Sequence, residues 1–135
     1  MKTCLLLIAH APLASALRAC ALHVFPECDA AVLALDIAPD AQPQQMCEAA
    51  HTLLQRSGAQ QTLVLSDVVG ATPCNVAQSL TGDDHVRLLA GVNLPMVLRA
   101  ITYREEPIAS LVERARLGGQ QGVVELQAML ECRGR

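Results

Sequence analysis

Short apolar runs alternate along this chain with longer segments in which apolar residues recur three or four positions apart. The apolar runs lie at 5–8, 30–37, 62–66 and 86–92. They show no regular polar alternation, which is typical of strands buried on both faces of a parallel sheet. The segments between them have the spacing of amphipathic helices. This order of elements predicts an α/β fold with a mostly parallel sheet.

Proline, glycine and capping residues mark where the predicted helices begin and end. Gly58 is a typical C-terminal cap, and Gly118-Gly119 is expected to end the last helix. Beyond that helix, the run at 122–126 predicts a fifth, short strand, and the tail after Gln127 has no clear assignment. The expected helix starts, at a first helical position or an N-cap, are Pro12, Pro43, Thr72-Pro73, Asn93 and Pro107.

The length of the chain fits one domain over residues 1–135, which is enough to bury a substantial core. The chain has one Phe, one Tyr and no Trp, so we expect a core of aliphatic side chains. Its net charge is −3, and its arginines are scattered rather than clustered. These two features argue against a surface that binds nucleic acid.

The N-terminus has features of a secretory signal, because Lys2 precedes an apolar run and 14–16 (A-S-A) is similar to a cleavage site. The run is short, however, and His10 and Pro12 interrupt it. No apolar stretch reaches the length of a membrane span. The six cysteines include no Cys-x-x-Cys pair and fall in apolar periodic segments. We therefore expect a cytoplasmic protein with buried, reduced thiols rather than disulfides.

Two side chains that are capable of chemistry stand at the ends of buried runs. His10 ends the first run, and Ser66-Asp67 ends the third. With a strand order of 2-1-3-4, the first and third strands are neighbours, and a crevice opens at their carboxyl ends because the chain changes direction between them. We therefore expect His10 and Asp67 to face each other across that crevice.

A carboxylate beside an imidazole fixes the ring tautomer and leaves the other ring nitrogen free to act as a nucleophile. The turn at 70–75 leads into a helix, and free backbone N–H groups there favour an anion. The sequence has no G-x-x-x-x-G-K-[ST] loop and a single lysine, so nothing in it is typical of a site for ATP with Mg²⁺. Together these features indicate phosphoryl transfer through a phosphohistidine on His10, with another phosphoprotein as donor.

Two other interpretations stay open. His10, Asp67 and Cys74 are residue types that bind zinc, so they form a possible metal site. Alternatively, the turn holds the phosphate of a nucleotide or another small molecule in a regulatory module, and His10 only forms a hydrogen bond. Asp36 ends the second run and is a weaker candidate for the same edge of the sheet.

Three motifs, in this order and spacing, resemble the mannose-type IIA protein of the bacterial phosphoenolpyruvate-dependent sugar phosphotransferase system. They are A-H-A-P at 9–12, S-D-V-V-G-A-T-P-C-N at 66–75 and A-G-V-N-L-P-M at 90–96. The resemblance covers nearly the whole chain. It implies a doubly wound parallel sheet of order 2-1-3-4 and a homodimer that exchanges an antiparallel C-terminal strand, here 122–126.

The same resemblance implies roles for individual residues. His10 matches the histidine that receives a phosphoryl group from the small carrier HPr and passes it to a IIB protein, in sugar transport or in a regulatory relay. Asp67 matches its orienting carboxylate, and Gly70, Ala71 and Thr72 match the turn that meets the phosphoryl group. No cofactor or metal is implied, and contact with a membrane is expected only through a transporter complex.

The chain departs from the usual pattern of that family in the turn. The second glycine is replaced by Ala71, and the serine by Thr72, which keeps the hydroxyl. Val69 and Cys74 stand where aromatic residues are common, and Ala11 stands where glycine is common. We expect these changes to affect the choice of partner and the rate more than the chemistry itself.

Overall fold

The protein, studied as a computed structural model, is described over residues 2–128. Its strands form one parallel sheet in the order β2-β1-β3-β4, which confirms the predicted α/β class and strand order. The strands are β1 (Thr3–His10), β2 (Val32–Ile37), β3 (Gln61–Ser66) and β4 (Val86–Ala90). The helices are α1 (Leu13–Val24), α2 (Pro43–Ser57), α3 (Thr72–Gln78), α4 (Leu94–Thr102) and α5 (Ile108–Gln121), with a short 3-10 helix, η1 (Pro26–Cys28).

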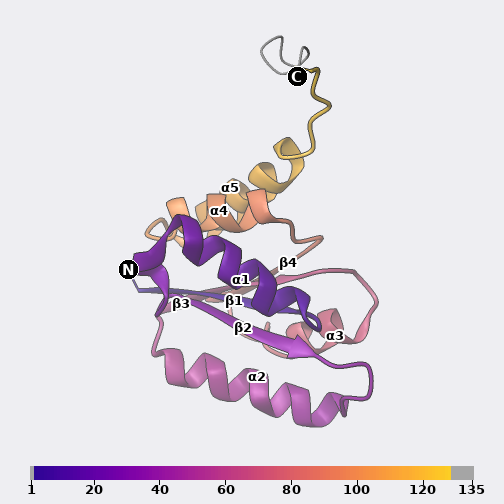
Figure 1. The fold of residues 1–135 in the computed structure, drawn as a ribbon. Helices are drawn as coiled ribbons and strands as arrows, with labels where there is room; N and C mark the ends of the chain where they lie inside the picture. The colour runs from indigo at the N-terminus through magenta and orange to yellow at the C-terminus, as the bar shows by residue number, and fades with distance from the viewer. Residues whose placement is uncertain (1, 129–135) are drawn as a thin grey trace.

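The sheet lies between two layers of helices (Figure 1). Helices α1, α4 and α5 cover one face, and α2 and α3 cover the other. Alternate residues of β1 point to opposite faces, so Leu5 and Leu7 join the first core and Leu6 and Ile8 the second. All four are fully buried, which explains why the strand is an uninterrupted apolar run.

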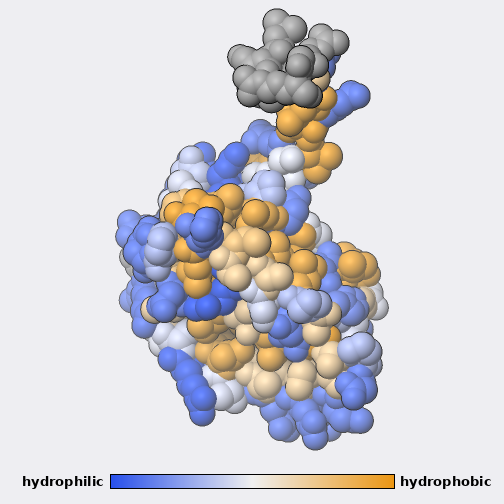
Figure 2. All heavy atoms as spheres, in the orientation of Figure 1, coloured by the Kyte–Doolittle hydropathy of each residue, from blue (hydrophilic) through white to orange (hydrophobic). Residues whose placement is uncertain are grey.

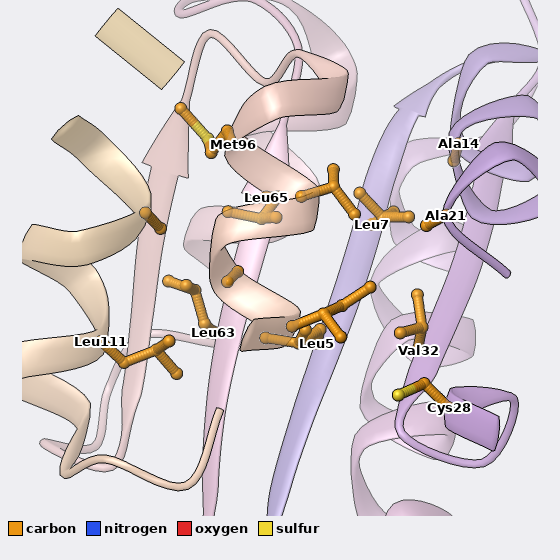
Figure 3. Close-up of a cluster of buried hydrophobic side chains, with 14 of the residues drawn as sticks. Leu5, Leu7, Ala14, Ala21, Cys28, Val32, Leu63, Leu65, Met96 and Leu111 are labelled. Carbon is orange, nitrogen blue, oxygen red and sulfur yellow. The ribbon is translucent and has the colours of Figure 1, made fainter. Parts of the chain in front are cut away.

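The core is aliphatic, as the composition predicted. Figure 3 shows leucines of β1 and β3 meeting Leu111 of α5 and Met96 of α4 on one face of the sheet. Small residues of α1, Ala14 and Ala21, are also fully buried and let that helix lie close to the sheet. Within residues 2–128, no helix is both long and apolar enough to cross a membrane.

Two predicted caps are confirmed, and three predicted helix starts are wrong by one residue. Gly58 ends α2 in the left-handed conformation with φ 61°, and the Asn93 side chain accepts a hydrogen bond from the Met96 N–H at 2.9 Å. Thr72 is not an N-cap, because the extended residue before the helix is Ala71 and Thr72 is already helical. Pro12 likewise precedes α1, and Pro107 precedes α5, instead of starting these helices.

The prediction that Gly118-Gly119 ends the last helix is wrong, since α5 continues to Gln121. These glycines instead allow α4 and α5 to approach closely. A Cβ atom on Gly118 would lie 2.6 Å from the Cβ of Arg99, and one on Gly119 would lie 2.7 Å from the Cε of Met96. The pair is therefore a packing feature rather than a stop signal.

Residues 122–128 leave the end of α5 and extend away from the rest of the chain (Figure 1). In the single chain these residues form neither helix nor strand. The predicted strand at 122–126 would pair with a second copy of the chain, so it stays a prediction.

The amino-terminal edge of the sheet carries a buried polar network. The Gln61 side-chain amide donates to the Thr3 hydroxyl at 2.8 Å and to the carbonyl of Glu106 at 2.7 Å. The Thr3 hydroxyl donates to the carbonyl of Arg104. Thr3 and Gln61 therefore fasten the loop between α4 and α5 to the first residues of β1 and β3.

Candidate active site

His10 and Asp67 meet at the carboxyl edge of the sheet, as the strand order predicted. His10 is the last residue of β1, and Asp67 directly follows the last residue of β3. The two strands are paired in register up to Ile8 and Ser66, so their ends lie side by side. The fold itself therefore brings together two residues that are far apart in the sequence.

The Asp67 carboxylate is held by hydrogen bonds on both oxygens. Its Oδ2 lies 2.6 Å from the His10 Nδ1 and also accepts the backbone N–H of His10 at 3.0 Å. Its Oδ1 accepts the backbone N–H of Val68 at 2.9 Å. Because of these contacts, the carboxylate is fixed in one orientation against the imidazole.

The environment of Asp67 favours its ionised form. Burial by itself would raise the pKa of Asp67, but the hydrogen bonds from the His10 N–H, the His10 ring and the Val68 N–H outweigh it. The pKa of Asp67 is therefore lowered from its ordinary value of 3.8. At neutral pH the Asp67 carboxylate is charged and can accept a hydrogen bond from the N–H at Nδ1 of His10.

The contact also decides which nitrogen of His10 is available. A carboxylate accepts hydrogen bonds, so the Nδ1 beside it carries the ring proton, and Nε2 keeps its lone pair. The His10 side chain is 54% exposed, whereas that of Asp67 is only 8% exposed. The pair therefore combines an exposed imidazole ring with a protected carboxylate that fixes its orientation.

The turn that follows Asp67 has a backbone that depends on one glycine. Gly70 has φ 89°, a left-handed conformation that glycine adopts without strain. Ala71 has φ −89° and ψ 164°, an ordinary extended conformation, so the alanine at this place is accommodated. The exposed Thr72 then begins α3.

Asp36 is not part of this constellation. Its Oδ1 accepts the backbone N–H of Ser15 at 3.0 Å, and its Oδ2 contacts the Ser15 hydroxyl. The carboxylate thus caps the first turn of α1 from a neighbouring strand, which explains why Pro12 needs no capping side chain of its own.

The possible zinc site receives no support from the donor geometry. Over residues 2–128, no three side chains of His, Cys, Asp or Glu are grouped so that they could hold a metal ion. Cys74 is buried in α3, as Cys4 in β1 and Cys28 in η1 are buried, whereas Cys20 of α1 is exposed. The five described cysteines are free thiols.

Comparison with known families identifies the arrangement. Residues 4–115 match the family model EIIA-man, described as the PTS system fructose IIA component. The chain belongs to the EIIA-man family. A search of curated proteins found no match to the chain.

Solved structures of IIA proteins share this fold. The mannose/sorbose-specific IIA subunit from Enterococcus faecalis is 28% identical, with a TM-score of 0.85 over 96% of this chain and 98% of that one. The EIIA component from Streptococcus agalactiae is 24% identical, with a TM-score of 0.78 over 91% and 96%. A PTS IIA protein associated with a fucose utilization operon in Streptococcus pneumoniae is 21% identical, with a TM-score of 0.78 over 93% of each chain.

Membership of the EIIA-man family gives the chain a phosphotransfer role in the sugar phosphotransferase system. In general, proteins of this family take a phosphoryl group from HPr and pass it to a IIB protein. The resemblance noted in the three sequence motifs is thereby confirmed.

Reasoning from residue types alone did not identify the support beneath Asp67 in this IIA chain. The N–H groups of Gly91 and Val92 donate to the carbonyls of Asp67 and Ser66, each at 2.9 Å. These residues belong to the A-G-V-N-L-P-M motif, which entered only through the resemblance. Backbone contacts leave no signal in side-chain chemistry, so the sequence pattern could not reveal them.

Proposed function

We propose that this IIA chain carries a phosphoryl group on Nε2 of His10, taken from phospho-HPr and passed to a IIB acceptor in the cytoplasm. The observation that supports this most directly is the 2.6 Å contact between the His10 Nδ1 and the Asp67 Oδ2. It gives the exposed ring one proton-bearing nitrogen on the carboxylate and one free nitrogen for the reaction.

In the proposed step, the Nε2 lone pair attacks the phosphorus atom of the phosphorylated carrier. A bond from Nε2 to phosphorus forms while the bond from phosphorus to the carrier breaks, and its electron pair returns to the carrier. The proton on Nδ1 stays in the hydrogen bond to Asp67, whose charge stabilises the imidazolium that forms. Transfer to the IIB protein is the same step in reverse with a different partner.

The turn after Asp67 is proposed to bind the phosphoryl oxygens. Gly70 and Ala71 supply backbone N–H groups, and Thr72 supplies a hydroxyl at the start of α3. Such donors stabilise the negative charge of a phosphoryl group without a metal ion. The replacement of a second glycine by Ala71 keeps the backbone N–H and ordinary backbone angles. In the free chain this N–H donates a long hydrogen bond, 3.4 Å, to the Val68 carbonyl, which a phosphoryl oxygen would have to replace.

We further propose that the chain is a homodimer that exchanges its C-terminal segment, here defined as residues 122–128. Val123, Val124 and Leu126 are 81%, 63% and 83% exposed in the single chain. Figure 2 shows hydrophobic atoms on the segment that protrudes from the body of the protein. β4 is an edge strand of the sheet, so it offers free backbone groups to a strand from a second copy.

The test of the phosphoryl carrier is intact-mass analysis after incubation with phosphoenolpyruvate, enzyme I and HPr. We expect one phosphate on the wild-type chain and none on His10→Ala. His51→Ala removes another exposed histidine, on α2, and serves as the matched control that keeps the phosphate. The bound phosphate is expected to be labile in acid and stable in base. A folded wild-type chain that gains no phosphate from a cognate HPr would refute the proposal.

A further inference from the structure

The turn between β4 and α4, residues 91–93, joins three parts of the protein. Its first two residues hydrogen-bond to the end of β3. The Gly91 N–H donates to the Asp67 carbonyl, and the Val92 N–H donates to the Ser66 carbonyl, each at 2.9 Å. Gly91 has φ 88°, so the turn depends on a left-handed residue. The backbone of the residue that orients His10 is therefore fixed by this turn.

The third residue of the turn, Asn93, uses both ends of its side-chain amide. The Oδ1 accepts the Met96 N–H at 2.9 Å and caps α4. The Nδ2 donates to the carbonyl of Gly119 in α5 at 3.0 Å. The first bond is an ordinary helix cap, whereas the second ties the turn to a helix that lies far along the chain.

The last turn of α5 is shaped to receive this bond. A Cβ on Gly119 would lie 2.7 Å from the Cε and 3.2 Å from the Cβ of Met96, and a Cβ on Gly122 would lie 2.5 Å from the Cβ of Pro95. Only residues without side chains therefore fit against residues 93–96 at this place. The C-terminal segment leaves α5 from the same turn.

We propose that Asn93 is a positioning residue that couples the last turn of α5 to the His10–Asp67 pair, so that losing its bond to Gly119 loosens the contact between His10 and Asp67 and slows phosphoryl transfer. The path runs from Gly119 through the Asn93 amide and the 91–93 turn to the backbone of Asp67. This inference rests on the function proposed for His10.

Two substitutions separate the helix cap on Met96 from the hydrogen bond to Gly119. Asn93→Asp and Asn93→Ser each keep an oxygen that caps α4, but neither has a side-chain N–H for the Gly119 carbonyl. Gln121→Ala is the matched control, because Gln121 lies in the same last turn of α5, is exposed, and its side chain accepts a hydrogen bond from Arg99 at 3.5 Å rather than from the 91–93 turn. This substitution shortens a side chain at the end of α5 and leaves the hydrogen bond between Asn93 and Gly119 in place.

Three measurements are made on the full-length chain and its variants. They are the rate of phosphorylation by phospho-HPr, the chemical shifts of the His10 ring nitrogens, and hydrogen exchange at the Gly91 and Val92 amides. The ring-nitrogen shifts report the contact with Asp67, which a loss of stability alone would leave unchanged in the folded protein.

We expect both Asn93 variants to fold, to exchange faster at Gly91 and Val92, to shift the His10 ring signals and to be phosphorylated roughly tenfold more slowly, within the usual range for coupled sites. Gln121→Ala is expected to match the wild type. Unchanged ring signals and rates in both Asn93 variants would overturn the inference, as would an equal effect of Gln121→Ala. If the wild type gains no phosphate, the proposed function fails, while the exchange and ring signals still decide whether Asn93 holds Asp67.

Discussion

The two edges of the parallel sheet carry polar side chains in opposite surroundings. At the amino-terminal edge, Thr3 and Gln61 are 6% and 2% exposed and hydrogen-bond to each other and to the loop after α4. At the carboxyl edge, the His10 side chain is 54% exposed and has a single side-chain partner, Asp67. One edge satisfies its polar groups inside the protein, and the other leaves a nitrogen free in solvent.

This difference teaches how the fold separates stability from reactivity. A buried hydrogen-bond network contributes to stability because leaving any member unpaired costs about 1–3 kcal/mol. A group that must react has to keep one position unpaired, so it belongs where water can satisfy that position. The sheet holds both kinds of group on the same strands, β1 and β3, at opposite ends.

The largest expected effect comes from breaking the carboxyl edge. Asp67→Asn keeps the size of the side chain but removes the charge that orients His10 and stabilises its cationic ring. We expect phosphorylation by phospho-HPr to slow roughly 10- to 100-fold, the scale found when the orienting partner of a metal-bound histidine is removed. Single-turnover rates from intact-mass measurements test this. A wild-type rate in folded Asp67→Asn would argue against the orienting role.

Disrupting the hydrogen-bond network at the amino-terminal edge should lower stability and leave the phosphorylation rate unchanged. Gln61→Leu removes the side-chain amide that donates two of the network's hydrogen bonds and leaves the Glu106 carbonyl without that partner. This should lower the free energy of unfolding by about 1–3 kcal/mol. Urea unfolding measures the loss, and the phosphorylation rate of the folded variant should stay at the wild-type value. Gln60→Leu, at the exposed neighbouring position, is the control that should change stability much less.

The pH dependence of stability sharpens the comparison. The folded-state pKa of Asp67 lies below its ordinary value of 3.8, so the unfolded chain binds a proton first as the pH falls. The stabilisation from Asp67 is therefore fully present above that value and is lost as the pH falls through the lower, folded-state pKa. Urea unfolding of wild type and Asp67→Asn should show a stability difference that shrinks in this acidic range. A difference independent of pH would contradict the lowered pKa.

The smallest expected effect is a difference in alkylation rate between a buried and an exposed cysteine. Burial raises the pKa of the Cys4 thiol, next to Thr3, to about 11, so at neutral pH it has almost no reactive thiolate. Cys20 of α1 is exposed. Alkylation of the native protein followed by peptide mass mapping should label Cys20 well before Cys4. Equal labelling of the two would show that the amino-terminal edge opens readily.

Much of the fold and the main site pair could be predicted from the sequence, because both depend on local patterns. The apolar run of β1 and the cap at Asn93 are visible in neighbouring residues, and the strand order then brings His10 to Asp67. The glycines at 118–119 misled the prediction because their role depends on Arg99 and Met96, which only the folded chain brings near. Which ring nitrogen of His10 faces Asp67 likewise depends on how the ring is rotated, which no spacing encodes.

The scarcity of aromatic residues gives this protein an unusual optical property. Tyr103 is its one tyrosine, and the chain has no tryptophan. The ring lies under the Arg114 guanidinium, 4.5 Å from its centroid, between α4 and α5. When the excitation wavelength is too long to excite Phe25, the fluorescence of the native chain therefore comes from Tyr103 alone. This emission should report how α4 and α5 dock against each other, and a change at His10 should leave it unaltered unless the change reaches Tyr103.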